Sequence, residues 1–217
     1  MTYTGDVTQG GPADVREIGA LRLHKVSVGP MDNNAYLLEC TAGGERLLVD
    51  AAAEPETLLG LLPDGRLEQV VTTHRHADHW QGLAEVVART GTRTLAGRPD
   101  VDAMPVATDQ PLDDGDRIRV GQVELEVISL VGHTPGSIAL LYDDQAGQPH
   151  LFTGDSLFPG GVGKTPDAAA FTSLLDDVEH KLFGRLPDDT WFYPGHGKDS
   201  TLGVERASIP QWRARGW

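Results

Sequence analysis

The sequence feature that most constrains this chain is a cluster of three histidines and one aspartate within six consecutive positions. The cluster reads His-Arg-His-Ala-Asp-His over residues 74–79 and follows a short apolar run. Residues two apart on an extended chain point to the same side, so His74 and His76 are expected to face one direction. Asp78 and His79 turn with the backbone towards a second direction, and imidazole and carboxylate groups are common metal ligands. The pattern predicts a loop that binds one or two metal ions.

Three later motifs, together with this cluster, resemble the signature of the metallo-β-lactamase-fold hydrolases. They are Gly-His-Thr-Pro-Gly at 132–136, Thr-Gly-Asp-Ser-Leu-Phe at 153–158 and Tyr-Pro-Gly-His-Gly at 193–197. The match extends from about residue 20 to about residue 200. The resemblance implies an α/β fold, a four-layer αββα sandwich in which helices cover the outer faces of two packed sheets.

The resemblance also implies a ligand set for two divalent ions. His74, His76 and His133 would hold the first ion, Asp78, His79 and His196 the second, and Asp155 would bridge them. Zn(II) is expected, with Fe(II) or Mn(II) as alternatives, because the ligands are imidazoles and carboxylates. Two ions roughly 3.5–4 Å apart lower the pKa of a shared water towards about 7 and polarise a carbonyl oxygen. Asp78 is expected to be catalytic as well, by orienting the hydroxide.

Most other polar residues have a simpler interpretation. A lone His133, His196 or Asp155 in a glycine-rich turn would usually be a solvated residue, and it is their order in the chain that favours the metal site. The histidines outside the motifs are expected to be structural or solvated: His24, His150 and His180. Cys40 is the single cysteine and lies in an apolar pattern, so a buried thiol is expected.

Length and charge restrict the function classes further. The chain has 217 residues, of which 39% are hydrophobic, and this favours one domain over residues 14–217 after a loose leader over residues 1–13. A net charge of -14 argues against nucleic acid and anionic membranes as partners. Residues 1–19 lack the basic and apolar regions of a signal peptide. A cytoplasmic protein that acts on a small molecule is expected.

Hydrophobic patterning predicts strands that alternate with amphipathic helices. Strands are expected at 21–28, 35–38, 46–49, 67–71, 93–96, 117–120, 123–128, 138–142, 150–153 and 190–193. Helices are expected at 58–62, at 81–89 and from an N-cap at Thr165 to Gly184, with two short C-terminal turns that carry Trp212 and Trp217. Residues 99–116 contain three prolines and six aspartates, so they are expected to cross the surface as a connection.

Residue types at two positions distinguish among the relatives that the resemblance brings in. True metallo-β-lactamases place Cys or Ser where this chain has Asp155, so β-lactam hydrolysis is disfavoured. Glyoxalase II-like thioesterases follow the bridging aspartate with a Gly-x-Gly-Lys/Arg segment whose basic residue contacts the thiol carrier, and Lys164 takes that position. Thr165-Pro166 lacks the tyrosine of that segment, and the residues after His196 are too few for the C-terminal helical domain of glyoxalase II.

Two reaction classes remain after these exclusions. The first is a glyoxalase II-like dinuclear hydrolase, in which a metal-bridging hydroxide attacks a thioester or a related ester or lactone. The second is a mononuclear iron persulfide dioxygenase, whose metal loop residues 73–79 also resemble, Ala77 included. That resemblance implies that only His74, His133 and Asp155 would bind the iron. A thioester is favoured because the thiol it releases has a pKa of about 8.5, so the thiolate can leave without a general acid. We expect an anionic thioester that Lys164 binds.

Overall fold

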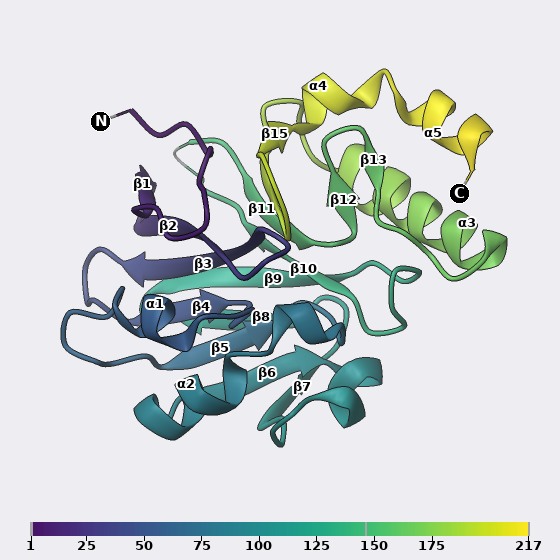
Figure 1. Cartoon of the computed structure of the whole chain (residues 1–217). Helices are drawn as coiled ribbons and strands as arrows, with labels where there is room; N and C mark the ends of the chain where they lie inside the picture. Colours follow the sequence, from purple (N-terminus) through teal and green to yellow (C-terminus); the bar gives the residue numbers. More distant parts are fainter. Residues whose placement is uncertain (1, 146, 217) are drawn as a thin grey trace.

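Unbroken apolar runs give the central strands two apolar faces each. In β4 (Arg46–Val49), Leu47 and Val49 enter one hydrophobic cluster and Leu48 enters another. In β11 (His150–Gly154), Phe152 and Leu151 diverge in the same way. A sheet with two apolar faces must be covered on both sides. The computed structural model, which describes residues 2–145 and 147–216, meets this need with four layers (Figure 1).

The first sheet has seven strands in sequence order. It consists of β1 (Asp14–Ile18), β2 (Leu21–Val28), β3 (Asn33–Cys40), β4, β5 (Gln69–Thr72), β6 (Arg93–Gly97) and β7 (Gln110–Leu112). The strands from β1 to β4 pair antiparallel, whereas the pairs from β4 to β7 are parallel. The parallel pairs require crossover connections, and α1 (Pro55–Leu59) and α2 (Leu83–Thr90) supply the first two.

The second sheet has six strands in the order β15-β14-β11-β10-β9-β8. These are β8 (Arg117–Val120), β9 (Val123–Ser129), β10 (Ile138–Tyr142), β11, β14 (Trp191–Pro194) and β15 (Ser200–Thr201). The pair β11–β14 is parallel and the others are antiparallel. A small hairpin of β12 (Leu157–Phe158) and β13 (Gly161–Val162) follows β11.

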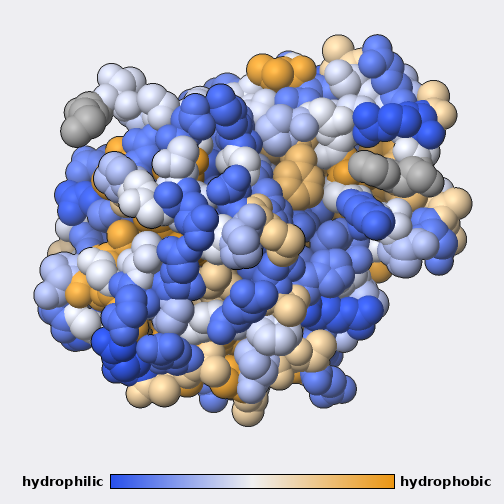
Figure 2. All heavy atoms as spheres, in the orientation of Figure 1, coloured by the Kyte–Doolittle hydropathy of each residue, from blue (hydrophilic) through white to orange (hydrophobic). Residues whose placement is uncertain are grey.

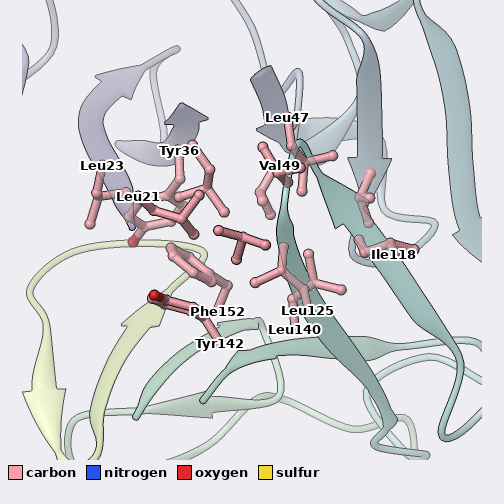
Figure 3. Close-up of a cluster of buried hydrophobic side chains, with 14 of the residues drawn as sticks. Leu21, Leu23, Tyr36, Leu47, Val49, Ile118, Leu125, Leu140, Tyr142 and Phe152 are labelled. Carbon is pink, nitrogen blue, oxygen red and sulfur yellow. The ribbon is translucent and has the colours of Figure 1, made fainter. Parts of the chain in front are cut away.

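The inner faces of the two sheets form the central core, which Figure 3 shows. Leu21, Leu23 and Tyr36 of the first sheet face Leu140 and Phe152 of the second. The ring of Tyr36 packs edge-on against Phe152, with centroids 5.5 Å apart. These apolar faces leave water together, and each fully buried Leu or Phe side chain contributes about 1.5–3 kcal/mol to folding.

Helices cover the outer faces of both sheets. Leu58 of α1 and Val86 of α2 share a cluster with the outer face of the first sheet. On the second sheet, α3 (Ala168–Asp177) continues as a π-helical turn (Val178–Phe183), and α4 (Leu202–Arg206) and α5 (Ile209–Arg215) follow β15 (Figure 1). The four layers confirm the predicted αββα sandwich.

Two local predictions were wrong. The N-cap of α3 is Asp167, whose carboxylate accepts from the Ala170 amide at 2.8 Å, and not Thr165. Residues 99–116 do more than cross the surface, because they contain most of a 3-10 helix (Arg98–Ala103), the edge strand β7 and a fully buried Asp100. Trp212 lies on α5 as expected, whereas Trp217 lies outside the described residues.

The N-terminal residues make side-chain contacts that were not predicted. Tyr3 donates to Asp199 at 2.6 Å, and the backbone amide of Thr4 donates to Asp14 at 2.8 Å.

The visible face in Figure 2 is mostly hydrophilic, with separate hydrophobic patches. Within residues 2–145 and 147–216 no helix is long and apolar enough to cross a membrane.

Candidate metal centre

The predicted ligands all follow strands whose carboxyl ends meet at one edge of the sandwich. In the first sheet β4 and β5 are parallel, so the loop that carries the histidine cluster starts beside Asp50. In the second sheet β11 and β14 are parallel and β9 runs in the same direction, because both β9 and β11 are antiparallel to β10. His133, Asp155 and His196 follow β9, β11 and β14, respectively. The topology therefore brings distant motifs to one place.

Hydrogen bonds between the two sheets close this edge. The Ile138 amide donates to the Thr73 carbonyl at 3.0 Å, and the Asn34 amide donates to the Gly195 carbonyl at 2.7 Å. After the strand β5 the chain turns at a short 3-10 helix (Ala77–His79), which redirects Asp78 and His79 away from His76. The predicted change of direction within the cluster is therefore present.

A first group of candidate ligands consists of His74, His76 and His133. The Nδ1 atom of His76 lies 2.9 Å from Nε2 of His133, which in turn lies 3.3 Å from Nε2 of His74. Their candidate ligand atoms all lie within 4.8 Å of one another. The first group combines the buried His74 with an exposed His76, so it opens towards solvent.

A second group consists of Asp78, His79 and His196, and its candidate ligand atoms also lie within 4.8 Å of one another. Oδ2 of Asp78 lies 3.4 Å from Nε2 of His196 and 3.6 Å from Nε2 of His79. Asp155 lies between the groups: Oδ1 is 3.3 Å from Nε2 of His79, and Oδ2 is 3.6 Å from Nε2 of His133 and of His196. Its carboxylate reaches both groups at once.

Outer hydrogen bonds determine which histidine nitrogens carry protons. The Nδ1 atom of His133 lies 2.6 Å from the Lys164 carbonyl, and that of His196 lies 2.9 Å from the Met31 carbonyl. A carbonyl only accepts, so both Nδ1 atoms must donate, and each Nε2 atom presents a lone pair to the interior. His79 is oriented in the same way, because its Nδ1 atom donates to Oδ2 of Asp50 at 2.8 Å and its Nε2 atom faces the interior. Such outer partners are typical of metal-binding histidines.

Two buried atoms at the centre lack a hydrogen-bond partner among the described residues, and they are Nε2 of His79 and Oδ1 of Asp155. A buried polar atom without a partner is costly. Imidazole nitrogens and carboxylate oxygens converge here, so a cation bound between them would satisfy these atoms. The residues present therefore fit a divalent transition metal.

The pKa values of these groups reflect the crowding of charge. Burial lowers the pKa of His74 well below its usual value and also lowers that of His133. Burial acts in the same direction on His79, but the carboxylates of Asp50 and Asp155 outweigh it and raise its pKa to about 10. Burial would raise the pKa of Asp155, yet the neighbouring imidazoles of His196 and His79 hold it well below the usual range. The carboxylate at the centre is thus ionised.

Asp50 organises the metal loop from beneath, a role that sequence reasoning missed. It adopts a positive φ of 60° and is buried. Its carboxylate accepts from the amide and the hydroxyl of Thr73, at 2.7 and 2.8 Å, and contacts Nδ1 of His79. The available signal was an aspartate directly after a buried strand, since such a charge needs specific partners.

Asp100 is the second residue that sequence reasoning missed. Its carboxylate accepts from the Arg75 amide at 3.0 Å, the Thr134 hydroxyl at 2.5 Å and the Gly136 amide at 3.0 Å. It therefore joins the histidine loop to the His133 loop. The aspartate-rich stretch around it concealed this one buried carboxylate.

The loop that carries His196 rests on a buried ion pair. Nζ of Lys25 lies 2.7 Å from Oδ1 of Asp199 and donates to the carbonyls of Gly197 and Gly5 at 2.8 and 2.7 Å. Asn34 donates to the Gly197 carbonyl as well, at 2.9 Å. The side chains of Lys25 and Asp199 are 0% and 1% exposed, so the pair is shielded from water.

Lys164 lies at the mouth of the centre. Its exposed side chain lines a hollow of about 370 Å³ together with Arg75, His76 and His133. Gly163 precedes it because a side chain there would clash with the Asp155 carbonyl. Gly163 is therefore needed for close packing beside Asp155, and Lys164 follows it at the hollow.

The fold and this cluster of histidines and aspartates define a metallo-β-lactamase-fold protein able to bind metal. The model of the Metallo-beta-lactamase superfamily matches residues 28–196, and the chain belongs to this family.

Two relatives show how similar the chain is in sequence to known proteins. Hydroxyacylglutathione hydrolase of Polaromonas sp. (strain JS666) is 37% identical over 166 residues, which cover 76% of this chain and 62% of that protein. An uncharacterized protein of Aquifex aeolicus (strain VF5) is 28% identical, with 85% of this chain and 94% of that protein covered. The chain thus spans about three fifths of the length of the hydroxyacylglutathione hydrolase.

Solved structures share the fold. The di-iron-bound form of TTHA1623 has a TM-score of 0.70 and 31% identity, with 86% of this chain and 98% of that chain covered. ETHE1 from Myxococcus xanthus has a TM-score of 0.74 and 26% identity, with 88% and 84% covered.

Proposed function

We propose that this protein is a hydrolase of anionic thioesters that depends on two divalent metal ions. The observation that carries the proposal is the second group, because Asp78, His79 and His196 converge with Asp155 although one ion would need only the first group and Asp155. Likeness to hydroxyacylglutathione hydrolases supports the reaction class. We assign His74, His76 and His133 to the first ion, the second group to the second ion, and Asp155 to both.

Zinc is our proposed metal, with iron or manganese as alternatives. Imidazole and carboxylate ligands suit all three. The di-iron-bound form of TTHA1623 supports iron as the alternative. When bound, the ions would lower the pKa of a water towards about 7 and polarise the thioester carbonyl.

The protein residues divide the remaining work. Asp78 accepts from the side-chain amide of Asn33 at 2.9 Å, which fixes its orientation, so its free oxygen lone pairs can orient the attacking water. The water releases a proton to solvent, its oxygen bonds to the carbonyl carbon and the carbon–sulfur bond breaks. The thiolate leaves with the electron pair of that bond and needs no general acid, and the new carboxylic acid releases the second proton to solvent. Lys164 binds an anionic group of the substrate at the mouth of the hollow.

The mononuclear iron persulfide dioxygenase remains the second candidate. It would require only His74, His133 and Asp155. The fold that the chain shares with ETHE1 supports this alternative. The unpartnered Nε2 of His79 argues against it. A single ion in the first group would leave this buried nitrogen with neither a metal ion nor a hydrogen-bond partner.

Metal content and turnover together test the proposal. The purified protein should carry two transition-metal ions per chain by elemental analysis, and chelation should abolish thioester hydrolysis. A fully active protein with one iron per chain, which consumes oxygen with a persulfide substrate, would establish the dioxygenase instead.

A further inference from the structure

Two adjoining hollows lie beside the first group. The metal-side hollow, of about 370 Å³, is the one that Lys164 lines. The apolar hollow, of about 350 Å³, shares Arg75, His133 and Pro166 with it, so the two lie side by side. A substrate held over the candidate metal centre therefore has a second space into which one end can extend.

The charge of these hollows is opposite to that of the chain. The sequence has 32 acidic and 18 basic residues, yet no acidic residue is among the described residues that line either hollow. The charged side chains in the two linings are Arg75 and Lys164. A local excess of positive charge in an acidic protein favours an anionic ligand.

Arg75 lines both hollows and can bind such an anion. Its backbone is fixed on both sides, because its amide donates to Asp100 at 3.0 Å and its carbonyl accepts from the Trp80 indole at 2.9 Å. Its side chain is 45% exposed, and Nε lies 3.9 Å from Oδ1 of Asp100, too far for a hydrogen bond. The guanidinium retains donors for a carboxylate, which it can bind through two parallel bonds.

The walls of the apolar hollow determine what lies next to that anion. Val131, Pro135 and Pro166 line it, together with Ala169 and Ala170 from the first turns of α3. Val131 is 39% exposed, an apolar side chain that a bound hydrocarbon chain would cover. The volume is at the small end of ligand pockets, which suits a short chain.

We propose that the apolar hollow is the acyl subsite, and that it binds an acyl group in which a short apolar chain carries a terminal carboxylate. Arg75 binds the carboxylate, and the walls of the hollow contact the chain. This inference rests on the proposed thioester hydrolase and specifies the class of acyl group that the hydrolase accepts.

A matched pair of substrates tests the subsite. The glutaryl and pentanoyl thioesters of one thiol have the same chain length and differ in the terminal carboxylate. The metal-loaded parent should prefer the glutaryl thioester in kcat/KM, and Arg75→Gln should reduce this preference about 10- to 100-fold, the range of a charge-assisted hydrogen bond. Arg98→Gln is the control, because Arg98 is also an exposed arginine but pairs with Asp113 outside both hollows. The control should keep the parent's preference.

A second variant and a binding measurement separate failure of the subsite from failure of the proposed function. Ala169→Leu narrows the hollow at an exposed position and should reduce kcat/KM more for pentanoyl than for acetyl thioesters. Calorimetry should detect tighter binding of glutarate than of pentanoate to the metal-loaded parent, and Arg75→Gln should remove the difference. Equal binding of glutarate and pentanoate overturns the subsite even if thioesters are hydrolysed. A clear glutarate preference without hydrolysis of any thioester supports the subsite and rejects the hydrolase.

Discussion

The two groups of the candidate metal centre differ in what holds them in place. The first group is held by hydrogen bonds to neutral partners: the Lys164 carbonyl fixes His133, and Asp100 joins the two loops that carry the group by accepting from amides and a hydroxyl. The second group stands on buried charges, since Asp50 holds His79 and the pair of Lys25 and Asp199 supports the loop of His196. The first group also opens to the hollows, whereas His79 is fully buried.

This difference suggests that substrate recognition and folding stability are linked to different groups. Changes near the first group should alter binding and specificity. Changes beneath the second group should alter the free energy of unfolding, because a buried charge that loses its partner is strongly unfavourable. Four predictions test this division, from the largest expected effect to the smallest.

Asp155→Ala removes the residue that the two groups share. The expected result is loss of both ions, with affinities at least about 100-fold weaker, because this carboxylate is a ligand and not only an outer partner. His196→Ala should mainly empty the second group. Metal titration followed by elemental analysis measures both, and His180→Ala, an exposed histidine, is the control. Equal loss of a single ion in Asp155→Ala and His196→Ala would contradict the shared role.

Lys25→Met leaves Asp199 buried without its cation. The variant should lose about 3–5 kcal/mol of stability, the usual cost of breaking a buried ion pair. Urea unfolding of the metal-free protein measures this loss. Lys198→Met is the control, because Lys198 pairs with Asp6 at the surface and such pairs contribute little.

The same variant should lose the ion of the second group before that of the first, since the Gly197 carbonyl that Lys25 binds follows His196 directly. If Lys25→Met weakens both ions equally, the division between the groups is wrong.

The titration of His150 tests the stability of β11 and β14, the strands that precede Asp155 and His196. Burial lowers the pKa of His150 to about 4, against about 6.5 in the unfolded chain. The folded state thus disfavours the proton, and stability is lost as the pH falls from about 6.5 towards 4. His150→Gln should make the decline between pH 7 and pH 5.5 shallower by about 1 kcal/mol. Parallel stability curves for the parent and the variant, measured with chelator, would refute this account.

Lys164→Ala should have the smallest effect. The carbonyl that fixes His133 belongs to the backbone and persists in the variant, so the first ion should stay bound. The lost ammonium should raise KM for anionic thioesters several-fold with little change in kcat, because it contacts ground and transition states alike. Lys164→Arg should restore most of the binding. An unchanged KM for anionic thioesters would remove Lys164 from substrate recognition.

The sequence predicted the elements whose pattern is local. Apolar alternation located the strands that became β3, β4, β8, β9, β10 and β11, and the dense histidine cluster indicated a metal site before any topology was known. The convergence of His133, Asp155 and His196 followed only from resemblance, because nothing in their separate turns requires them to meet.

The supporting residues could not be predicted, because their partners lie far away in the chain. Lys25 and Asp199 are 174 residues apart, and each alone has the composition of a surface residue. Asp100 was hidden among neighbouring aspartates that are exposed, such as Asp113 and Asp114. The N-cap at Asp167 was missed because Thr165-Pro166 has an equally good capping pattern two residues earlier.

The buried carboxylate of Asp100 has a consequence for how this protein can change. It joins the histidine loop to the His133 loop through two backbone amides and one hydroxyl. The walls of the apolar hollow on α3 take no part in these hydrogen bonds. Substitutions confined to Ala169, Ala170 and Ser173, which line the hollow, should therefore reshape the proposed acyl subsite while the loops of the candidate metal centre keep their relative position. New substrate preferences should then be accessible to this scaffold in single steps that leave the metal ligands unchanged.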